Sequence, residues 1–244
     1  MDTIGENGSY IVLLDENGER WNPTPIQDFT SILKIPMIRR NNAYTTSKNI
    51  AYSLQYLQLL QKILDSVYLT DVLEKMVCKN YIITAMSIVE AVFAYLVRES
   101  GNWKTSEWKS IHKINVENAK GITFQGETLK VITELYKKVD AYTVEMQTGA
   151  IIDKIKSKHL MTFKSEKAFN VLKKYTALRN KVHLHIRDDV TDYRSFDREG
   201  QIQMKIILRA VLINKTVCSD ETRIDDVYGF LNLTNEDKEQ IGIN

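Results

Sequence analysis

The most constraining feature of this sequence is the placement of its prolines. All three, Pro23, Pro25 and Pro36, lie in the first 36 residues of the 244-residue chain, so the remaining 208 residues contain none. Proline breaks helices, and a long proline-free stretch rich in Leu, Lys, Glu, Ile and Ala favours helices joined by short polar turns. We therefore predict an all-α fold for most of the chain.

Hydrophobic periodicity sets the expected helix boundaries. The segment 79–100 is apolar nearly all round, which predicts a central buried helix. Glu90 interrupts its apolar run, and a charge there would be costly in lipid, so we interpret the segment as a core helix and not as a membrane span. The predicted helices cover 46–64, 68–77, 79–100, 127–147, 164–186 and 198–214, with a short one near 220–231.

The N-terminal region differs in character. Residues 9–22, SYIVLLDENGERWN, contain a β-prone run, a turn segment with a glycine and a possible return strand, which predicts a small β-hairpin. We expect this hairpin to be an appendage that packs on something else. The chain is thus predicted to have three parts: 1–44, the hairpin and a linker; 45–215, a helical domain; and 216–244, a C-terminal extension that packs on the bundle.

Charge is unevenly distributed along the chain. Residues 154–187 hold ten Lys or Arg and one acid, Glu166, which gives this window +9, while the net charge of the whole chain is +2. The rest of the chain therefore carries −7. A basic segment in an otherwise acidic protein favours a phosphate-backbone ligand, and a solvated lysine-rich face is the alternative.

Compartment and cofactor signals are few. The first ten residues have neither the basic start nor the apolar core of a secretory signal. Cys78 and Cys218 lie far apart without CxxC spacing, which indicates neither a disulfide framework nor a zinc site. We expect a cytoplasmic protein that needs no membrane, no metal and no other cofactor.

The segment ALRNKVHLHI, residues 177–186, concentrates the residues suited to catalysis. On a helix, Arg179 and His183 are four residues apart and share a face, and Asn180 and His183 are also adjacent. On an unbroken helix His185 continues the apolar stripe instead. We expect one histidine to be functional while the other packs.

An Arg and a His at one phosphate can cleave RNA without a metal. The imidazole is the usual general acid or base near neutral pH, and the guanidinium stabilises the charge that develops on phosphorus. The product is a 2′,3′-cyclic phosphate, and two copies of the site across a twofold axis supply both an acid and a base. The cations predicted to bind RNA beside the site are Lys173, Lys174, Lys181 and Arg187.

Two segments of the chain together resemble the HEPN superfamily. They are the long apolar, Glu-bearing segment ITAMSIVEAVFAYLVRE (83–99) and the later LRNKVHLHI. The family signature is an Arg, often followed by Asn, then four to six residues and a His. Arg179 to His185 leaves five residues between them and fits, whereas Arg179 to His183 leaves three. The resemblance therefore favours His185, while helix geometry favours His183.

This resemblance covers roughly residues 45–215 and implies a bundle of about five to seven helices. It implies a metal-independent endoribonuclease that acts as a homodimer, in prokaryotic antiphage defence, abortive infection or a toxin–antitoxin pair with a cognate antitoxin. Glu90 matches an acidic position on the core helix of many members, where it would orient the Arg or the His. Other members have lost catalysis and bind RNA or a partner protein, which is the alternative function.

Several of these residues also have purely structural interpretations. Arg179 can form an ion pair with Glu90 inside the bundle, because a buried carboxylate needs a partner. Asn180 can serve as a structural hydrogen-bonding residue. Trp103 and Trp108 can stack on bases, but after a helix end they are expected to cap the core.

Overall fold

A computed structural model describes residues 13–15, 17–36, 42–115, 122–124, 127–129, 132–163, 165, 167–180 and 191–240. The chain divides into two compact units. The helical unit comprises Met1–Ser100 with Thr148–Asn244, and the ribbon unit comprises Gly101–Gln147. The described residues are mostly helical, as predicted, but the ribbon unit is an antiparallel β-structure that departs from the predicted all-α fold.

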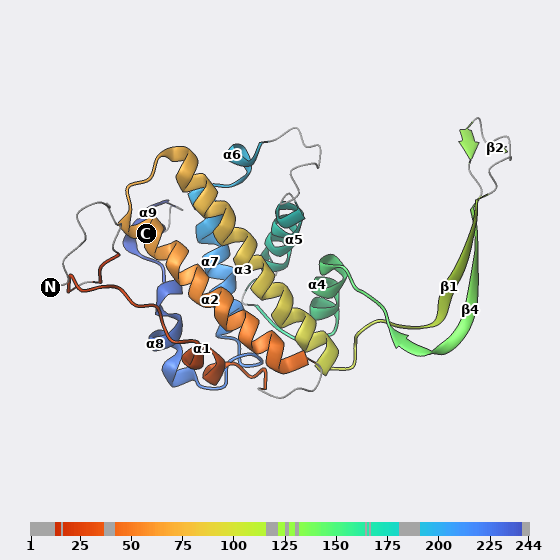
Figure 1. Ribbon diagram of the computed structural model, residues 1–244, viewed down its shortest axis with the longest axis horizontal. Coiled ribbons are helices and arrows are strands. Elements are labelled where there is room, and N and C mark those ends of the chain that lie inside the picture. Colours follow the sequence, from red (N-terminus) through yellow and green to blue (C-terminus); the bar gives the residue numbers. More distant parts are fainter. Residues whose placement is uncertain are drawn as a thin grey trace, which may run out of the picture. The chain divides into compact units, whose positions relative to one another are not determined.

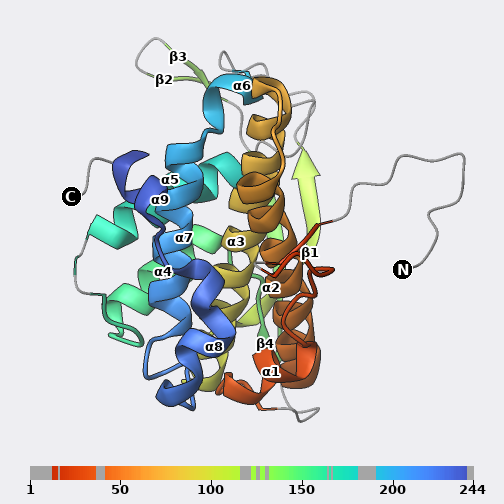
Figure 2. The same cartoon turned by 90° about the vertical axis from the view of Figure 1, so that its left-hand side faces the viewer.

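The core of the helical unit is built on α3 (Asp71–Glu99), which runs alongside α2 (Ala43–Ser66) and α7 (Arg198–Leu212) (Figures 1 and 2). The segments predicted as two helices, 68–77 and 79–100, form this single helix, because no glycine, proline or polar turn separates them. Its length and apolar character would allow it to cross a membrane, with a mean hydropathy of 1.6, yet 56% of that apolar window is buried inside the unit. This agrees with its interpretation as a core helix.

Two further helices, α4 (Thr148–Ser157) and α5 (Lys167–Asn180), contact α3 and each other. Helix α5 confirms the described part of the helix predicted at 164–186. Helix α4 was not predicted, although its buried side chains Ile151, Ile152 and Ile155 follow a helical repeat. A short helix, α6 (Asp192–Ser195), precedes α7, whose N-cap Asp197 accepts a hydrogen bond from Gly200 N at 2.7 Å.

The segment around α1 (Ile26–Ile32) packs against residues 217–228 of the later chain. After α1, which was not predicted, Lys34 N donates to Val217 O at 2.7 Å, and Phe29 stacks on Tyr228 with ring centroids 6.3 Å apart. The C-terminal elements are η2 (Glu221–Arg223), α8 (Ile224–Tyr228), η3 (Gly229–Leu231) and α9 (Asn235–Gln240). They confirm the short helix predicted near 220–231, and they belong to the same compact unit as the bundle.

The described part of the predicted N-terminal hairpin is a tight turn. Leu14 and Arg20 form an antiparallel bridge, and the Asp15 carboxylate accepts hydrogen bonds from Asn17 N and Glu19 N, both at 2.9 Å. Gly18 has a φ of +76°, the left-handed conformation that such turns require and that glycine adopts without strain. These described residues form a turn; the rest of the predicted hairpin, residues 9–12 and 16, lies outside the described residues.

The ribbon unit contradicts the helix predicted at 127–147. Strand β1 (Thr105–Asn115) pairs antiparallel with β4 (Ile132–Thr143), and β2 (Ile122–Phe124) pairs with β3 (Glu127–Leu129). Within β4 the residues Ile132, Leu135, Tyr136 and Val139 fit a helical repeat, which misled the prediction. The segment is also rich in β-branched and aromatic residues, and pairing with β1 over most of its length decides in favour of a strand.

The two tryptophans of this region both belong to the ribbon unit. Trp103 lies at the base of the ribbon, where its indole Nε1 donates to Val144 O at 2.9 Å, and Val144 N donates to Lys104 O at 2.9 Å. Trp108 lies on β1 with 54% of its surface exposed. The indole of Trp103 thus stabilises the base of the ribbon, and that of Trp108 faces solvent.

Candidate active site

The candidate site is centred on Glu90, in the second half of α3. Its carboxylate has partners from two other helices: Arg179 Nη1, near the end of α5, lies 3.2 Å from Oε2, and Thr148 Oγ1, the first residue of α4, donates to Oε1 at 2.7 Å. The predicted contact between Arg179 and Glu90 is therefore present. The site is the point where α3, α4 and α5 meet.

The carboxylate is held deeper in the unit than the guanidinium. The Glu90 side chain is 24% exposed and the Arg179 side chain 37% exposed, while Thr148 is buried. A guanidinium has five N–H donors in a planar fork, and Glu90 is the acid that contacts it among the described residues. Arg179 is thus anchored by Glu90 while part of its side chain remains exposed.

The structure places only part of the predicted catalytic set. Asn180 is the last residue of α5, so its backbone is placed one residue beyond Arg179. His183, His185, Lys181 and Arg187 lie outside the described residues. Their approach to Arg179, and the choice between the two histidines, therefore remain predictions from the sequence.

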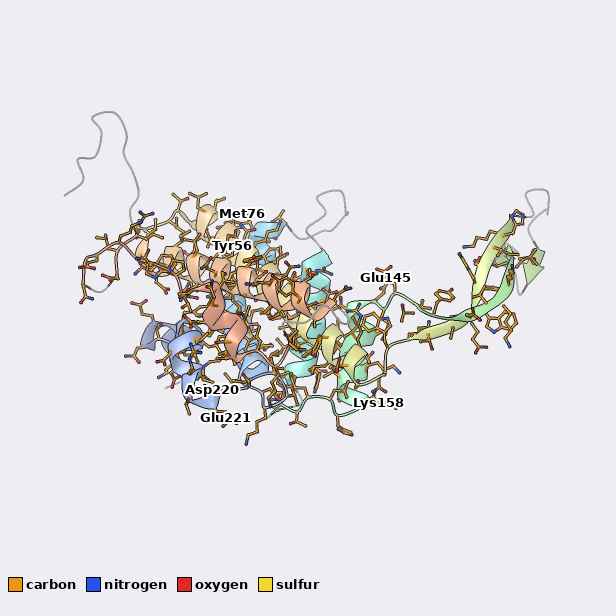
Figure 3. The ribbon with its side chains drawn as sticks, turned by 60° about the horizontal axis from the view of Figure 1, so that its bottom comes forward. Tyr56, Met76, Glu145, Lys158, Asp220 and Glu221 are labelled. Carbon is orange, nitrogen blue, oxygen red and sulfur yellow. The ribbon has the colours of Figure 1, made fainter. Side chains whose placement is uncertain are left out.

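The two other predicted RNA-binding residues lie on α5. Lys173 Nζ forms an ion pair with Asp153 of α4 at 2.7 Å, and Lys174 Nζ lies 5.5 Å from the ring centroid of Tyr175. Both lysines are exposed. Lys158, which directly follows α4, projects from the surface of the unit (Figure 3). The surface of α4 and α5 is therefore rich in cations, although Asp153 offsets the charge of Lys173.

Other reactive groups in the described residues do not form a competing site. No group of three or more His, Cys, Asp or Glu side chains that could hold a metal occurs within the described ranges. Cys78 is fully buried on α3, and burial raises the pKa of its thiol to about 12. A thiol with such a pKa is not a nucleophile near neutral pH.

Sequence analysis missed Thr148 and a buried ionic cluster. Thr148 follows the segment wrongly assigned to a helix, so its position at the start of α4 was hidden. In the cluster, Lys205 Nζ of α7 donates to Asp237 Oδ2 of α9 at 2.6 Å, and the side chains are 1% and 0% exposed. Arg198 Nη2 lies 3.1 Å from Asp65 and 3.5 Å from Asp237. Lys205 lies on an apolar face of α7. The local sequence around it does not indicate that its partner is Asp237, far along the chain.

Protonation of this cluster is set by opposing effects at Asp237. Burial raises the pKa of its carboxyl group, but hydrogen bonds from Lys205 and from Thr234 N, with the charges of Lys205 and Arg198, outweigh burial and lower that pKa below its ordinary value. The carboxylate is therefore ionised at neutral pH and balances the buried lysine. The cluster fastens α9 to α7 and has no evident catalytic role.

Comparison of the chain with protein-family models, with curated proteins and with solved structures finds no match. A function for this protein must therefore be argued from its own residues. The contacts of Arg179 with Glu90, and of Glu90 with Thr148, are the structural part of that argument. The spacing of Arg179 from His185 is the sequence part.

Proposed function

We propose that the protein is a metal-independent endoribonuclease with a HEPN-like helical domain. The observation that carries this proposal is the anchoring of Arg179 by Glu90 on the core helix, directly before the histidine segment and with the Arg179 side chain 37% exposed. A half-exposed Arg fixed at one end is suited to hold a phosphodiester in one orientation. The basic residues of α4 and α5 support an RNA ligand over a neutral one.

In the proposed reaction, the imidazole of His185, or of His183, takes the proton from a ribose 2′-hydroxyl. The 2′-oxygen then attacks the adjacent phosphorus, and the bond from phosphorus to the 5′-oxygen breaks. The leaving 5′-oxygen receives a proton from a general acid, which gives a 5′-hydroxyl and a 2′,3′-cyclic phosphate. Arg179 stabilises the additional negative charge on the phosphoryl oxygens, and Glu90 and Thr148 hold it in position.

A second copy of the chain would complete this chemistry. One histidine cannot be ready to accept and to donate a proton at the same moment, so a pair of sites across a twofold axis supplies both forms. We propose a cytoplasmic homodimer that acts in prokaryotic antiphage defence or in a toxin–antitoxin pair. Control by an antitoxin or another defence partner fits an enzyme whose substrate is cellular RNA.

The alternative function is a non-catalytic HEPN-like module that binds RNA or a partner protein. The ion pair between Arg179 and Glu90 is the observation that favours it, since an Arg engaged with a core acid can be purely structural. The two functions share the same basic surface. They differ in whether bound RNA is cut.

Replacement of Arg179 by Lys separates these functions. Lysine keeps the charge, and an ion pair with Glu90 remains possible, but it lacks the planar fork that contacts two phosphoryl oxygens. We expect Arg179→Lys to retain RNA binding and to lose cleavage by about 100-fold, the scale of one misplaced stabilising group. Cleavage would be measured on labelled RNA in EDTA, with binding measured in parallel. RNA that is bound but never cut by the wild type supports the alternative, and unchanged cleavage by Arg179→Lys excludes Arg179 from catalysis.

A further inference from the structure

The longer strand pair of the ribbon unit, β1 with β4, carries exposed hydrophobic side chains. Strands β1 and β4 pair over most of their length, and their side chains project from both faces (Figure 3). Trp108, Tyr136, Ile111 and Leu135 are between 46% and 60% exposed. A two-stranded hairpin is at best marginally stable in water without something to pack against. The ribbon therefore has the character of a binding element.

On one face of the ribbon, the polar side chains form hydrogen bonds and an ion pair with one another. Glu134 accepts hydrogen bonds from Ser110 at 2.7 Å and from Tyr136 at 2.9 Å, and Lys113 lies 3.9 Å from the same carboxylate. Because Ser110 pairs with Tyr136 and Lys113 pairs with Glu134, these four residues share that face. Its charges are balanced within the ribbon.

The opposite face has a different charge pattern. Lys109 and Lys137 are directly opposite each other in the ladder, and His112 lies opposite Leu135. Like charges directly opposite on one face are destabilising. Within the part of the chain that the structure describes, no acid forms an ion pair with either lysine. This face, which we call the lysine face, therefore carries two lysines that no described acid neutralises through an ion pair.

We propose that the lysine face of the ribbon binds the phosphate backbone of double-stranded RNA. Two cations facing each other without an acid are matched by a polyanion, and displacement of counterions from the RNA would favour binding. The wide, shallow minor groove of A-form RNA admits a flat element that contacts backbone and 2′-hydroxyls. This inference rests on the proposed function, because it assigns the ribbon to the same class of ligand.

The test uses the full-length protein with Arg179→Ala, so that RNA stays intact, in EDTA. Binding to a fluorescein-labelled 20-base-pair RNA is followed by anisotropy as a function of KCl concentration. Lys109→Gln with Lys137→Gln removes the two unpaired cations. Lys113→Gln with Lys138→Gln is the matched control: it removes the same charge from the same strands, but each of these lysines has an acid nearby, Glu134 at 3.9 Å and Glu107 at 3.7 Å.

We expect Lys109→Gln/Lys137→Gln to weaken duplex binding at least tenfold at 0.1 M KCl. The slope of log affinity against log salt should fall by about 1.8, the loss of two phosphate contacts at about 0.9 each. The control pair should change affinity less than threefold. Removal of a charge repulsion should not unfold the ribbon, and circular dichroism checks this. Equal weakening in both pairs, no binding by the parent protein, or tighter binding to a single strand would overturn the proposal.

The outcomes also separate this inference from the nuclease proposal. If the wild type cuts RNA and the lysine-face variant binds and cuts equally well, the nuclease stands and the ribbon inference is wrong. If duplex RNA binds through Lys109 and Lys137 but is never cut, the ribbon inference stands and the nuclease proposal is wrong. Light scattering reports the oligomeric state of the protein. If the variant changes this oligomeric state but not the affinity for RNA, the lysine face forms a protein contact and the inference is wrong.

Discussion

At the scale of single residues, Glu90 links the fold to the proposed chemistry. One carboxylate oxygen accepts a hydrogen bond from Thr148 and the other forms an ion pair with Arg179, so one side chain joins three helices. Its position on an apolar helix predicts that it needs a partner, and Arg179 is that partner. The role of Thr148 could not be predicted, because it depends on where α4 begins.

Replacement of Glu90 by Gln should uncouple stability from activity. Gln can still accept the hydrogen bond from Thr148 but no longer holds Arg179 by charge. A partly exposed ion pair contributes about 1 kcal/mol or less, so the free energy of unfolding should change little. The rate of RNA cleavage should fall on the order of 10- to 100-fold, because Arg179 loses its fixed position. Glu99→Gln, an exposed acid on the same helix, is the control, and equal activity in both variants would count against a positioning role.

The buried pair of Lys205 and Asp237 makes a contrasting prediction. Asp237→Asn leaves a buried lysine charge without its counter-charge and should reduce the free energy of unfolding by about 3 to 5 kcal/mol. The double replacement Lys205→Met with Asp237→Leu removes both charges and should restore most of that loss. Chemical denaturation gives the free energy of unfolding of the wild type, of Asp237→Asn and of the double variant. A double variant as unstable as Asp237→Asn would show that packing, and not charge, is responsible.

The same pair should make stability depend on acid. The pKa of Asp237 in the folded protein lies below its ordinary value of 3.8. The stability contributed by its ionised form is therefore fully present well above pH 3.8, and it is lost as the pH falls through the lower folded-state pKa. The free energy of unfolding of the wild type should thus decrease more steeply in this acid range than that of Lys205→Met/Asp237→Leu. Parallel pH profiles for the two proteins would contradict this assignment.

At the scale of elements, the comparison of α3 with β4 shows what a sequence pattern can decide. Helix α3 was predictable because most of its apolar residues from Cys78 to Val97 are buried within one unit, and only the division at residues 77–79 was wrong. Strand β4 was not predictable, because Ile132, Leu135, Tyr136 and Val139 satisfy a helical repeat as well as a β-rich composition. What decides between them is the partner strand β1, a contact that no local pattern reports.

The ribbon should be dispensable for folding of the helical unit. The base of the ribbon is closed by the hydrogen bond from Val144 N to Lys104 O, so the two chain ends lie close together there. Replacement of residues 105–143 by a four-residue Gly-Ser linker should leave the melting temperature of the helical unit within a few degrees, because loop length changes stability only slightly. Circular dichroism at 222 nm follows the transition. Loss of a cooperative transition would mean that the ribbon completes the fold.

At the scale of the whole molecule, sequence reasoning predicted the helical class and the central helix, but not the ribbon. The sequence predicted Glu90 and Arg179 of the candidate site, since both lie on helices with a clear pattern of apolar residues. His183 and His185 lie outside the described residues, so their role remains a prediction from spacing alone. Long-range partners such as Asp237 for Lys205 were not predictable, because they join segments with no shared local pattern.

The central claim is that Arg179 and His185 act on one phosphodiester without a metal. The most direct measurement is cleavage of a 5′-labelled structured RNA in EDTA, with the ends of the products identified. His159→Gly is the matched control, since it removes another imidazole at a residue whose φ of +50° suits glycine. We predict that wild type and His159→Gly produce 2′,3′-cyclic phosphate ends, while His185→Ala produces none and remains folded. Undiminished cleavage by His185→Ala, or intact RNA with every variant, would contradict the account.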